Sequence, residues 1–285
     1  MTAEVPARAV PGMRGTDAER KRDGSRSSLV WDILAQVVDE RVAQTGRAAL
    51  DIVDVGAGTG GFAVSLASRG HRVTVVDPSP DALTAARWRA AEAGVTLTDV
   101  QGEAGDLAAL VGEPAADGAG ADLVICHNVL EYVDSPSIAL AAVARVLRPG
   151  GTVSVLAANS VAAVLQRALA GKYAEARALL PGGTSSDAAP AASAARTAAP
   201  GTARRFTLPE LTALLEGAGL RAGDAHGIRI FAGLLPGAAS DPAAAEALRE
   251  LEEAAASCPP LRDIATRLHV LGHRPASPTA RVTPR

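Results

Sequence analysis

Short apolar runs alternate with longer amphipathic segments through the first half of the chain. Runs of strand length occur at about 49–55, 72–77, 96–101, 122–127 and 152–157. The segments between them have apolar residues at helical spacing, and so does 27–43, which precedes the first run. Regular alternation of strand and helix predicts an α/β fold with a doubly wound, mostly parallel sheet.

The pattern changes after residue 157. Segments 159–170 and 173–180 have helical spacing, and we expect a helical cap inserted within 158–205. The later part of that insertion, 181–202, is low in complexity and rich in Gly, Ala, Ser, Thr and Pro, which predicts a mobile loop.

The chain then returns to regular structure. Thr207 and Glu210 have the spacing of a capping box, which predicts a helix ending at Gly217. Two late strands are expected at about 226–234 and 265–272, and an Ala-rich helix at 241–257 separates them. We predict one domain over 26–275, with disordered tails at 1–25 and 276–285, because both ends are polar and rich in Pro or Gly.

A glycine-rich loop follows the first predicted strand. Gly56, Gly58 and Gly61 come directly after it, and Asp77 ends the second strand. Glycine lets the backbone turn tightly and approach a ligand closely, and an acid at the end of the next strand can accept hydrogen bonds from ribose hydroxyls. This βαβ arrangement predicts a nucleoside site.

Other candidate residues stand at or just beyond strand ends, namely Asp54, Asp106 and His127. Ligands of doubly wound sheets bind beyond the carboxyl ends of the strands, near the point where strand order reverses. We therefore expect these residues to converge with Gly56 and Asp77 on one crevice.

The amino-acid composition limits the kinds of partner that we expect this protein to bind. The net charge of −3 in 285 residues provides no global basic field for nucleic acid, although a local patch is compatible with it. Two cysteines, Cys126 and Cys258, indicate neither a disulfide framework nor a metal site. No apolar run has the length that crosses a bilayer and no signal peptide is recognisable, so we expect a cytoplasmic protein with no membrane partner.

Three features resemble class I methyltransferases. Asp54 stands two residues before Gly56, as in their E/D-x-G-x-G-x-G motif; an acidic loop, 103–106, follows the third strand; and 146–151 precedes an apolar strand. The resemblance implies S-adenosylmethionine as cofactor, rather than a nicotinamide, and a Rossmann-like sheet closed by an antiparallel hairpin. A Rossmann-type domain for another nucleotide is the alternative.

A narrower resemblance, to the tRNA 5-carboxymethoxyuridine methyltransferases, rests on Arg26 and Trp31 and on segments 126–132, 170–173, 227–231 and 267–270. It extends from about Arg26 to Pro275, interrupted at 181–203, and implies methylation of the carboxylate of a modified wobble uridine. The cofactor contacts that it implies are Arg26, Gly56, Ala57, Asp77, Ala104 and His127, to which position in the fold adds Asp54, Gly58 and Asp106. Arg229, Arg267 and His269 are candidates to orient an anionic acceptor through charge-assisted hydrogen bonds.

Two departures favour a small-molecule acceptor instead of tRNA. Leu268 stands where the family has an aromatic residue, and a lysine run of the family is reduced to Arg204 and Arg205. A non-catalytic nucleotide-binding module is a third hypothesis.

Individual residues also have alternative roles. Asp54 either contacts the cofactor or caps a neighbouring turn. Arg229 and Arg267 pair with either a substrate anion or an internal carboxylate, because an unpaired charge in an apolar strand is costly. His269 is a candidate for core packing as well as for acceptor binding.

Overall fold

The computed structural model describes residues 17–114, 120–180, 203–234 and 241–276, and for 17–28 it describes the backbone alone. The low-complexity loop and most of the two predicted tails therefore lie outside the described residues. So does the side chain of Arg26, whose backbone is part of the first helix.

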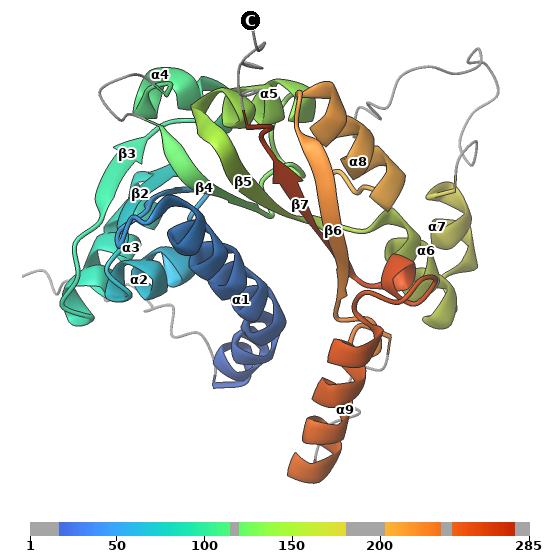
Figure 1. The fold of residues 1–285 in the computed structure, drawn as a ribbon. Helices are drawn as coiled ribbons and strands as arrows, with labels where there is room; N and C mark the ends of the chain where they lie inside the picture. The colour runs from blue at the N-terminus through green and yellow to red at the C-terminus, as the bar shows by residue number, and fades with distance from the viewer. Residues whose placement is uncertain (1–16, 115–119, 181–202, 235–240, 277–285) are drawn as a thin grey trace, which may run out of the picture.

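The described residues form a sheet of seven strands in the order β3-β2-β1-β4-β5-β7-β6 (Figure 1). Strands β1 to β5 are parallel, and β7 pairs antiparallel with both β5 and β6. The bounds are β1 Asp51–Val55, β2 Arg72–Asp77, β3 Thr98–Gln101, β4 Ala121–His127, β5 Leu147–Ala158, β6 Arg221–Ile228 and β7 Arg267–His273. The predicted doubly wound sheet with an antiparallel closing pair is confirmed.

Helices cover both faces of the sheet (Figure 1). One face packs against α1 (Asp17–Thr45), α2 (Gly61–Ser68) and α3 (Pro80–Glu92). The other packs against α4 (Leu107–Val111), α5 (Pro136–Val146) and α8 (Leu208–Gly217). Because side chains alternate along a strand, Val124 and Cys126 of β4 join the second core, whereas Leu123 and Ile125 join the first.

The remaining elements lie near the carboxyl ends of the strands. They are α6 (Ser160–Leu169), α7 (Tyr173–Ala178), α9 (Pro242–Ala255) and the short 3₁₀ helices η1 (Ala104–Asp106) and η2 (Arg262–Ile264). The helices predicted at 159–170, 173–180 and 241–257 are thus present. That α6 and α7 form a cap stays a prediction.

The capping residues explain where several helices begin. Thr207 and Glu210 form the predicted capping box of α8, in which each side chain accepts a hydrogen bond from the other residue's backbone N–H. Ser79 and Ser135 cap α3 and α5, each followed by a proline in the first turn. Local sequence therefore determines the starts of these helices.

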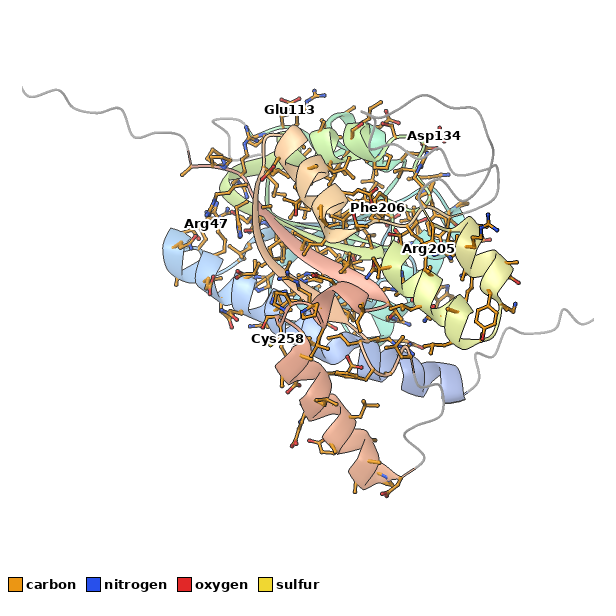
Figure 2. All side chains as sticks on the ribbon, turned by 90° about the vertical axis from the view of Figure 1, so that its right-hand side faces the viewer. Arg47, Glu113, Asp134, Arg205, Phe206 and Cys258 are labelled. Atoms are coloured by element: carbon orange, nitrogen blue, oxygen red, sulfur yellow. The ribbon has the colours of Figure 1, made fainter. Side chains whose placement is uncertain are left out.

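A buried carboxylate joins α1 to the sheet at the amino ends of the strands. Asp122 is 1% exposed and accepts hydrogen bonds from Arg41 of α1 at 3.2 Å, from Arg47 at 2.7 Å and from Arg148 at 2.8 Å. Figure 2 shows Arg47 beside the end of α1. The backbone N–H of Asp51 is a further donor to the same carboxylate, at 3.1 Å. This ion network fixes the carboxyl-terminal end of α1. That end lies at the amino ends of the strands, away from the carboxyl ends where ligands of such sheets bind.

The bounds of three elements differ most from the predictions, and one of them is β5, which begins at Leu147 rather than at residue 152. Helix α1 begins at Asp17 rather than at residue 27. Strand β6 spans Arg221–Ile228 rather than 226–234, because Arg229 has a φ of 60°, which an extended strand does not allow. Beyond it, the backbone N–H groups of residues 230–232 donate to the Glu252 carboxylate of α9 at 2.7–2.8 Å instead of to a strand.

Candidate active site

The glycine loop joins β1 to α2 in a conformation that suits glycine. Gly56, Gly58 and Gly60 have φ angles of 64°, 52° and 72°, in the left-handed region. A Cβ on Gly56 would also meet Val129 Cγ2 at 2.5 Å, and one on Gly60 would meet Ala86 Cβ at 2.9 Å. Gly60 is the last glycine of the E/D-x-G-x-G-x-G motif that begins at Asp54, and its backbone conformation explains why glycine stands there.

Asp77 fixes this loop. It is 7% exposed, and its Oδ2 accepts a hydrogen bond from the Gly58 N–H at 3.0 Å. Its Oδ1 accepts from the Ser79 N–H at 2.9 Å, next to the start of α3. Asp77 therefore holds two loops together at the carboxyl end of β2, and its contact with a ribose stays a prediction.

Asp77 also lines a cavity of about 340 Å³, here called the Asp77 cavity. Its walls are Val55, Gly56, Asp77, Pro78 and 102–104 on one side and Asn128, Val129 and 132–134 on the other. Ala104, for which a cofactor contact is predicted, lines this cavity, and so does Glu103. Asp106 is exposed and is not among the lining residues, although it lies in the same acidic loop.

A second cavity, of about 490 Å³, adjoins the first at Gly56 and Asn128, which line both. We call it the His127 cavity. It is lined by Trp31, Asp54, Gly56, Ala57, Thr59, Gly61, Phe62, Ser65, Arg89, His127 and Asn128. Phe62 stacks on Trp31 with ring centroids 6.4 Å apart and meets the His127 ring edge-on at 5.1 Å.

Asp54 is buried at the junction of β1 and α2. Burial, and then the negative charge of Asp77, raise the pKa of Asp54 to about 7, although a hydrogen bond from the Ala63 backbone opposes the shift. Ala63 belongs to the first turn of α2, so Asp54 makes the capping contact that the sequence left open. Because Asp54 also lines the His127 cavity, the two predicted roles are compatible.

Arg267 begins β7 and lies beside the carboxyl end of β5, where it pairs in register with Ala158. Its guanidinium contacts Glu131 Oε1 at 3.3 Å, which is the internal partner that the sequence left open. Glu131 is 4% exposed, and burial raises the pKa of its carboxyl group. Its Oε2 has no hydrogen-bond partner among the described residues.

The other two acceptor candidates differ in position. Arg229 follows β6 in the left-handed conformation, and its carbonyl oxygen accepts from the Thr266 N–H at 3.2 Å. His269 is fully buried, with Nε2 2.7 Å from Ser154 Oγ. This contact places His269 within the sheet core and not at the surface of either cavity, so a direct contact with an acceptor would require movement of its neighbours.

Comparison with known proteins agrees with this geometry. A methyltransferase domain model matches residues 53–155. A tRNA 5-carboxymethoxyuridine methyltransferase of Escherichia coli O157:H7 is 28% identical over 254 residues, which is 88% of this chain and 89% of that protein. A ubiquinone biosynthesis O-methyltransferase of Xanthomonas axonopodis pv. citri is 35% identical over 134 residues, which is 47% of this chain and 53% of that one.

The fold is shared with a magnesium protoporphyrin IX methyltransferase from Synechocystis PCC 6803, solved with bound S-adenosylhomocysteine. The TM-score is 0.54 at 15% identity, over 93% of this chain and 90% of that one. The chain is a class I S-adenosylmethionine-dependent methyltransferase.

The residues of this methyltransferase fit its cofactor. The two adjoining cavities offer a close backbone approach at the glycine loop and carboxylates at the ends of β1 and β2. They also offer an unpartnered ring nitrogen, His127 Nδ1, which is buried and has no hydrogen-bond partner among the described residues. A buried polar atom without a partner in a cavity wall is suited to bind a ligand.

Within the described residues, the methyltransferase has no group of three or more His, Cys, Asp or Glu side chains arranged to hold a metal. Nor does any helix in that part of the chain have the length and apolarity needed to span a membrane.

Sequence reasoning missed several cavity residues of the methyltransferase. Asn128 lines both cavities and has a φ of 57°, which Asn tolerates better than most residues. Its position directly after a strand end was the available signal. Phe62 and Val129 contribute through packing with residues distant in the sequence, and no local pattern indicates that.

Proposed function

We propose that this methyltransferase forms a methyl ester on the carboxylate of 5-carboxymethoxyuridine in tRNA. The observation that carries the proposal is the extent of the likeness to the Escherichia coli enzyme, which covers nearly all of both chains. It includes the carboxyl-terminal half, where β6, β7 and the candidate acceptor residues lie. The ubiquinone O-methyltransferase likeness covers about half of this chain.

The cofactor residues divide between the two cavities in this proposal. Asp77, Glu103 and Ala104 would hold the adenosine part, and Gly56 and Ala57 the methionine part, with the His127 ring beside the methyl group. S-adenosylmethionine supplies a methyl group already activated by a positively charged sulfur. The protein therefore has to hold the acceptor oxygen in line with that methyl group and exclude water.

A carboxylate acceptor suits the arginines near the ligand edge. Because it is already anionic, it needs no base to remove a proton, and it needs a cation to hold it. Arg267 is partly exposed, with 37% of its side chain accessible, and lies beside the end of β5. We infer that Arg267 orients the acceptor carboxylate while Glu131 fixes the guanidinium.

Basic side chains near α6 and α7 provide a local surface for tRNA phosphates. Arg167, Lys172 and Arg177 lie on or beside these helices, and Glu175 of α7 pairs with Arg167 at 3.5 Å and with Lys172 at 3.4 Å. Figure 2 shows Arg205 next to α6, and the Ser160 N–H donates to the neighbouring Phe206 carbonyl at 3.0 Å. Such a patch supports contact with a phosphate backbone even in a chain of negative net charge.

The test is methyl transfer to two tRNA preparations that differ in one modification. Purified enzyme and methyl-tritiated S-adenosylmethionine are incubated with tRNA that carries 5-carboxymethoxyuridine and with the same tRNA lacking it. We expect label in the modified tRNA alone, and we expect mild alkali to release it as methanol because it is held as an ester. Label in both preparations, or alkali-stable label, would contradict the proposal.

A second candidate is O-methylation of a small molecule. The Xanthomonas relative and the net charge of −3 favour it. The same assay with a small-metabolite extract in place of tRNA distinguishes the two. An alkali-stable labelled product from the extract, with none from tRNA, would support this candidate over the first.

Substitution at the ion pair tests the role of Arg267. Arg267→Met alone leaves the buried Glu131 without its cation, which destabilises the fold whatever the function. Arg267→Met combined with Glu131→Gln removes both charges, and we expect a folded protein that binds S-adenosylhomocysteine but loses turnover. Normal turnover of the double variant would show that Arg267 only balances Glu131.

A further inference from the structure

A row of three histidines and one serine crosses the face of the sheet that packs against α1. His127 Nε2 lies 2.7 Å from Ser154 Oγ, and Ser154 Oγ lies 2.7 Å from His269 Nε2. His269 Nδ1 then lies 3.4 Å from His226 Nδ1. The row runs in space across β4, β5, β7 and β6, although its members are far apart in the sequence.

The row lies in a protein interior, where polar groups are costly. His127, Ser154 and His269 are 8%, 0% and 0% exposed, and Ile125 and Leu156 of the apolar core lie on the same sheet face. Valine or leucine at these positions would pack without any hydrogen-bonding requirement. Each member instead bonds to the next, so the row forms a continuous hydrogen-bonded path.

The two ends of the row reach different cavities. His127 lines the His127 cavity, and its Nδ1 has no partner. His226 lines a separate cavity of about 230 Å³ between α1 and strands β5, β7 and β6, here called the His226 cavity. The row is therefore the connection between a site for methyl transfer and a second, polar cavity.

Charged groups lie near both ends. The His226 cavity is lined by Glu40 and Arg41 of α1, Asp224 of β6 and His273 of β7. The positive charge of Arg262 also contributes to lowering the pKa of His226. Asp54 and Arg89 share the cavity of His127.

Burial keeps the rings neutral. It lowers the pKa of His127 to about 3, and it lowers the pKa values of His269 and His226 as well. An extra proton therefore does not remain on one ring as an imidazolium. A proton that enters at one end leaves the row neutral only if another proton leaves at the far end.

We propose that this row is a proton relay, which lets the methyltransferase also methylate neutral acceptors that carry an O–H or N–H group. In the receptive state, His127 carries its proton on Nε2, Ser154 donates to His269, and His269 donates from Nδ1 to His226. The acceptor oxygen forms its bond to the methyl group, and its O–H bond breaks toward His127 Nδ1.

The remaining protons then move by one position each. The Nε2 proton of His127 passes to Ser154, the hydroxyl proton of Ser154 to His269 Nε2, and the Nδ1 proton of His269 to His226. His226 releases its Nε2 proton to water in the His226 cavity. One proton enters and one leaves, so charge balances without another reactant.

This activity goes beyond the proposed ester formation, because a carboxylate has no proton to lose. Methyl transfer to a hydroxyl or amine releases one proton for each methyl group. General-base assistance of that kind contributes about 10²- to 10⁴-fold to rate. The relay and the carboxylate proposal therefore stand or fall separately.

Histidine NMR of the cofactor-free protein tests the relay without any turnover. The chain has five histidines, so ¹⁵N ring signals can be assigned by single substitutions. His226→Phe removes the far end of the row, and we expect it to shift the tautomer ratio of His127, three hydrogen bonds away. In a Ser154→Ala background the same substitution should have no effect on His127.

His273→Phe is the matched control. His273 also lines the His226 cavity and bonds to a hydroxyl of β5, Thr152 Oγ1 at 3.1 Å, but it is not bonded to the row. It should leave the His127 tautomer ratio unchanged. A His127 ratio that ignores His226→Phe, or that responds equally to His273→Phe, overturns the proposal.

Turnover with catechol as the probe acceptor tests the activity. We expect the wild-type protein to methylate catechol, and His226→Phe to lower kcat with little change in KM and to move the pH profile. His273→Phe should behave as the wild type. No methylation of catechol by the wild type, or equal kcat in both variants, overturns the inferred activity.

Discussion

Asp54 and Asp77 lie near the carboxyl ends of β1 and β2, and their different surroundings suit the two side chains to different roles. Asp77 accepts hydrogen bonds from two backbone N–H groups. Asp54, 4% exposed, has burial and the Asp77 charge against its ionised form. Asp77 is thereby suited to accept hydrogen bonds from a ligand, and Asp54 is suited to respond to charge in the His127 cavity.

Asp54 gives a pH-dependent prediction. Its pKa of about 7 is raised from an ordinary value of 3.8, so between these pH values the folded state keeps a proton that the unfolded state has released. Folding stability then falls as pH rises through this window, by up to ~1.4 kcal/mol per pH unit. Asp54→Asn cannot titrate, and its stability relative to the wild type should increase from pH 4 to pH 7.

Urea unfolding at several pH values across that window measures this difference. Asp81→Asn, at an exposed position in the first turn of α3, is the control and should show no such trend. A stability difference between Asp54→Asn and wild type that stays constant with pH would contradict the assigned shift.

At the scale of single residues, position at a strand end indicated part of the cavity lining. Of the five residues chosen in this way, Asp54, Gly56, Asp77 and His127 line one of the two adjoining cavities and Asp106 does not. Their contact with the cofactor stays a prediction. The internal partner of Arg267 could not be foreseen, because Glu131 is 136 residues away in the chain. The hydroxyl of Ser154 and the ring of His226 likewise acquire their neighbours only when the sheet is assembled.

At the scale of elements, the attachment of helix α1 to the sheet depends on the charge of Asp122, which lies in β4. Asp122 is the second residue of β4 and binds Arg41, Arg47 and Arg148 from three different segments. Asp51 adds a second acid to the network, bonded to Arg72 at 2.6 Å. Burial raises the pKa of Asp51, but the arginine hydrogen bonds outweigh burial and lower it to about 2. Asp51 therefore remains ionised through ordinary pH.

Asp122→Asn should strongly destabilise the protein. It leaves three guanidinium groups beside a neutral amide in a site where the carboxylate is fully buried, and breaking a buried pair costs about 3–5 kcal/mol. Asp39→Asn removes an exposed α1 carboxylate bonded to Arg69 at 2.7 Å, and its cost should be within ~1 kcal/mol.

Equilibrium unfolding in urea compares the two variants directly. Equal costs for Asp122→Asn and Asp39→Asn would contradict the assigned role of the buried network.

Element prediction from sequence worked where the pattern was continuous. β2 was predicted at 72–77 and spans Arg72–Asp77, and the capping box placed the start of α8. The prediction for β6 was wrong because its register shifts between Ala222 and Ala225, which interrupts alternation. The apolar residues after Arg229 looked like strand but bind Glu252 through their backbone.

In the molecule as a whole, the amino ends and the carboxyl ends of the parallel strands have separate roles. The Asp122 network lies at the amino ends of the parallel strands, where β1 and β4 begin. Asp54, Asp77 and His127 lie at the carboxyl ends, where ligands of doubly wound sheets bind. Stabilising charges are thus separated from the site, and this arrangement follows from the parallel topology that the sequence pattern predicts.

The acceptor side is the part of the molecule that sequence determines least. Strand order follows from alternation and from the glycine loop, because short connections and right-handed crossovers allow few topologies. The acceptor surface instead combines β7, the segment after β4 and the region beside α6, whose contacts are all long-range. Its composition therefore emerges only from the assembled structure.

The central claim is that the Asp77 and His127 cavities together bind the cofactor, and calorimetry with S-adenosylhomocysteine tests it most directly. The account predicts one site per chain, no binding of NAD, and an affinity loss of roughly 1.5–3 kcal/mol for Asp77→Asn, whose amide no longer provides a charged acceptor. Asp81→Asn should bind as the wild type. Binding of NAD alone, or unchanged S-adenosylhomocysteine affinity in Asp77→Asn, would contradict the account.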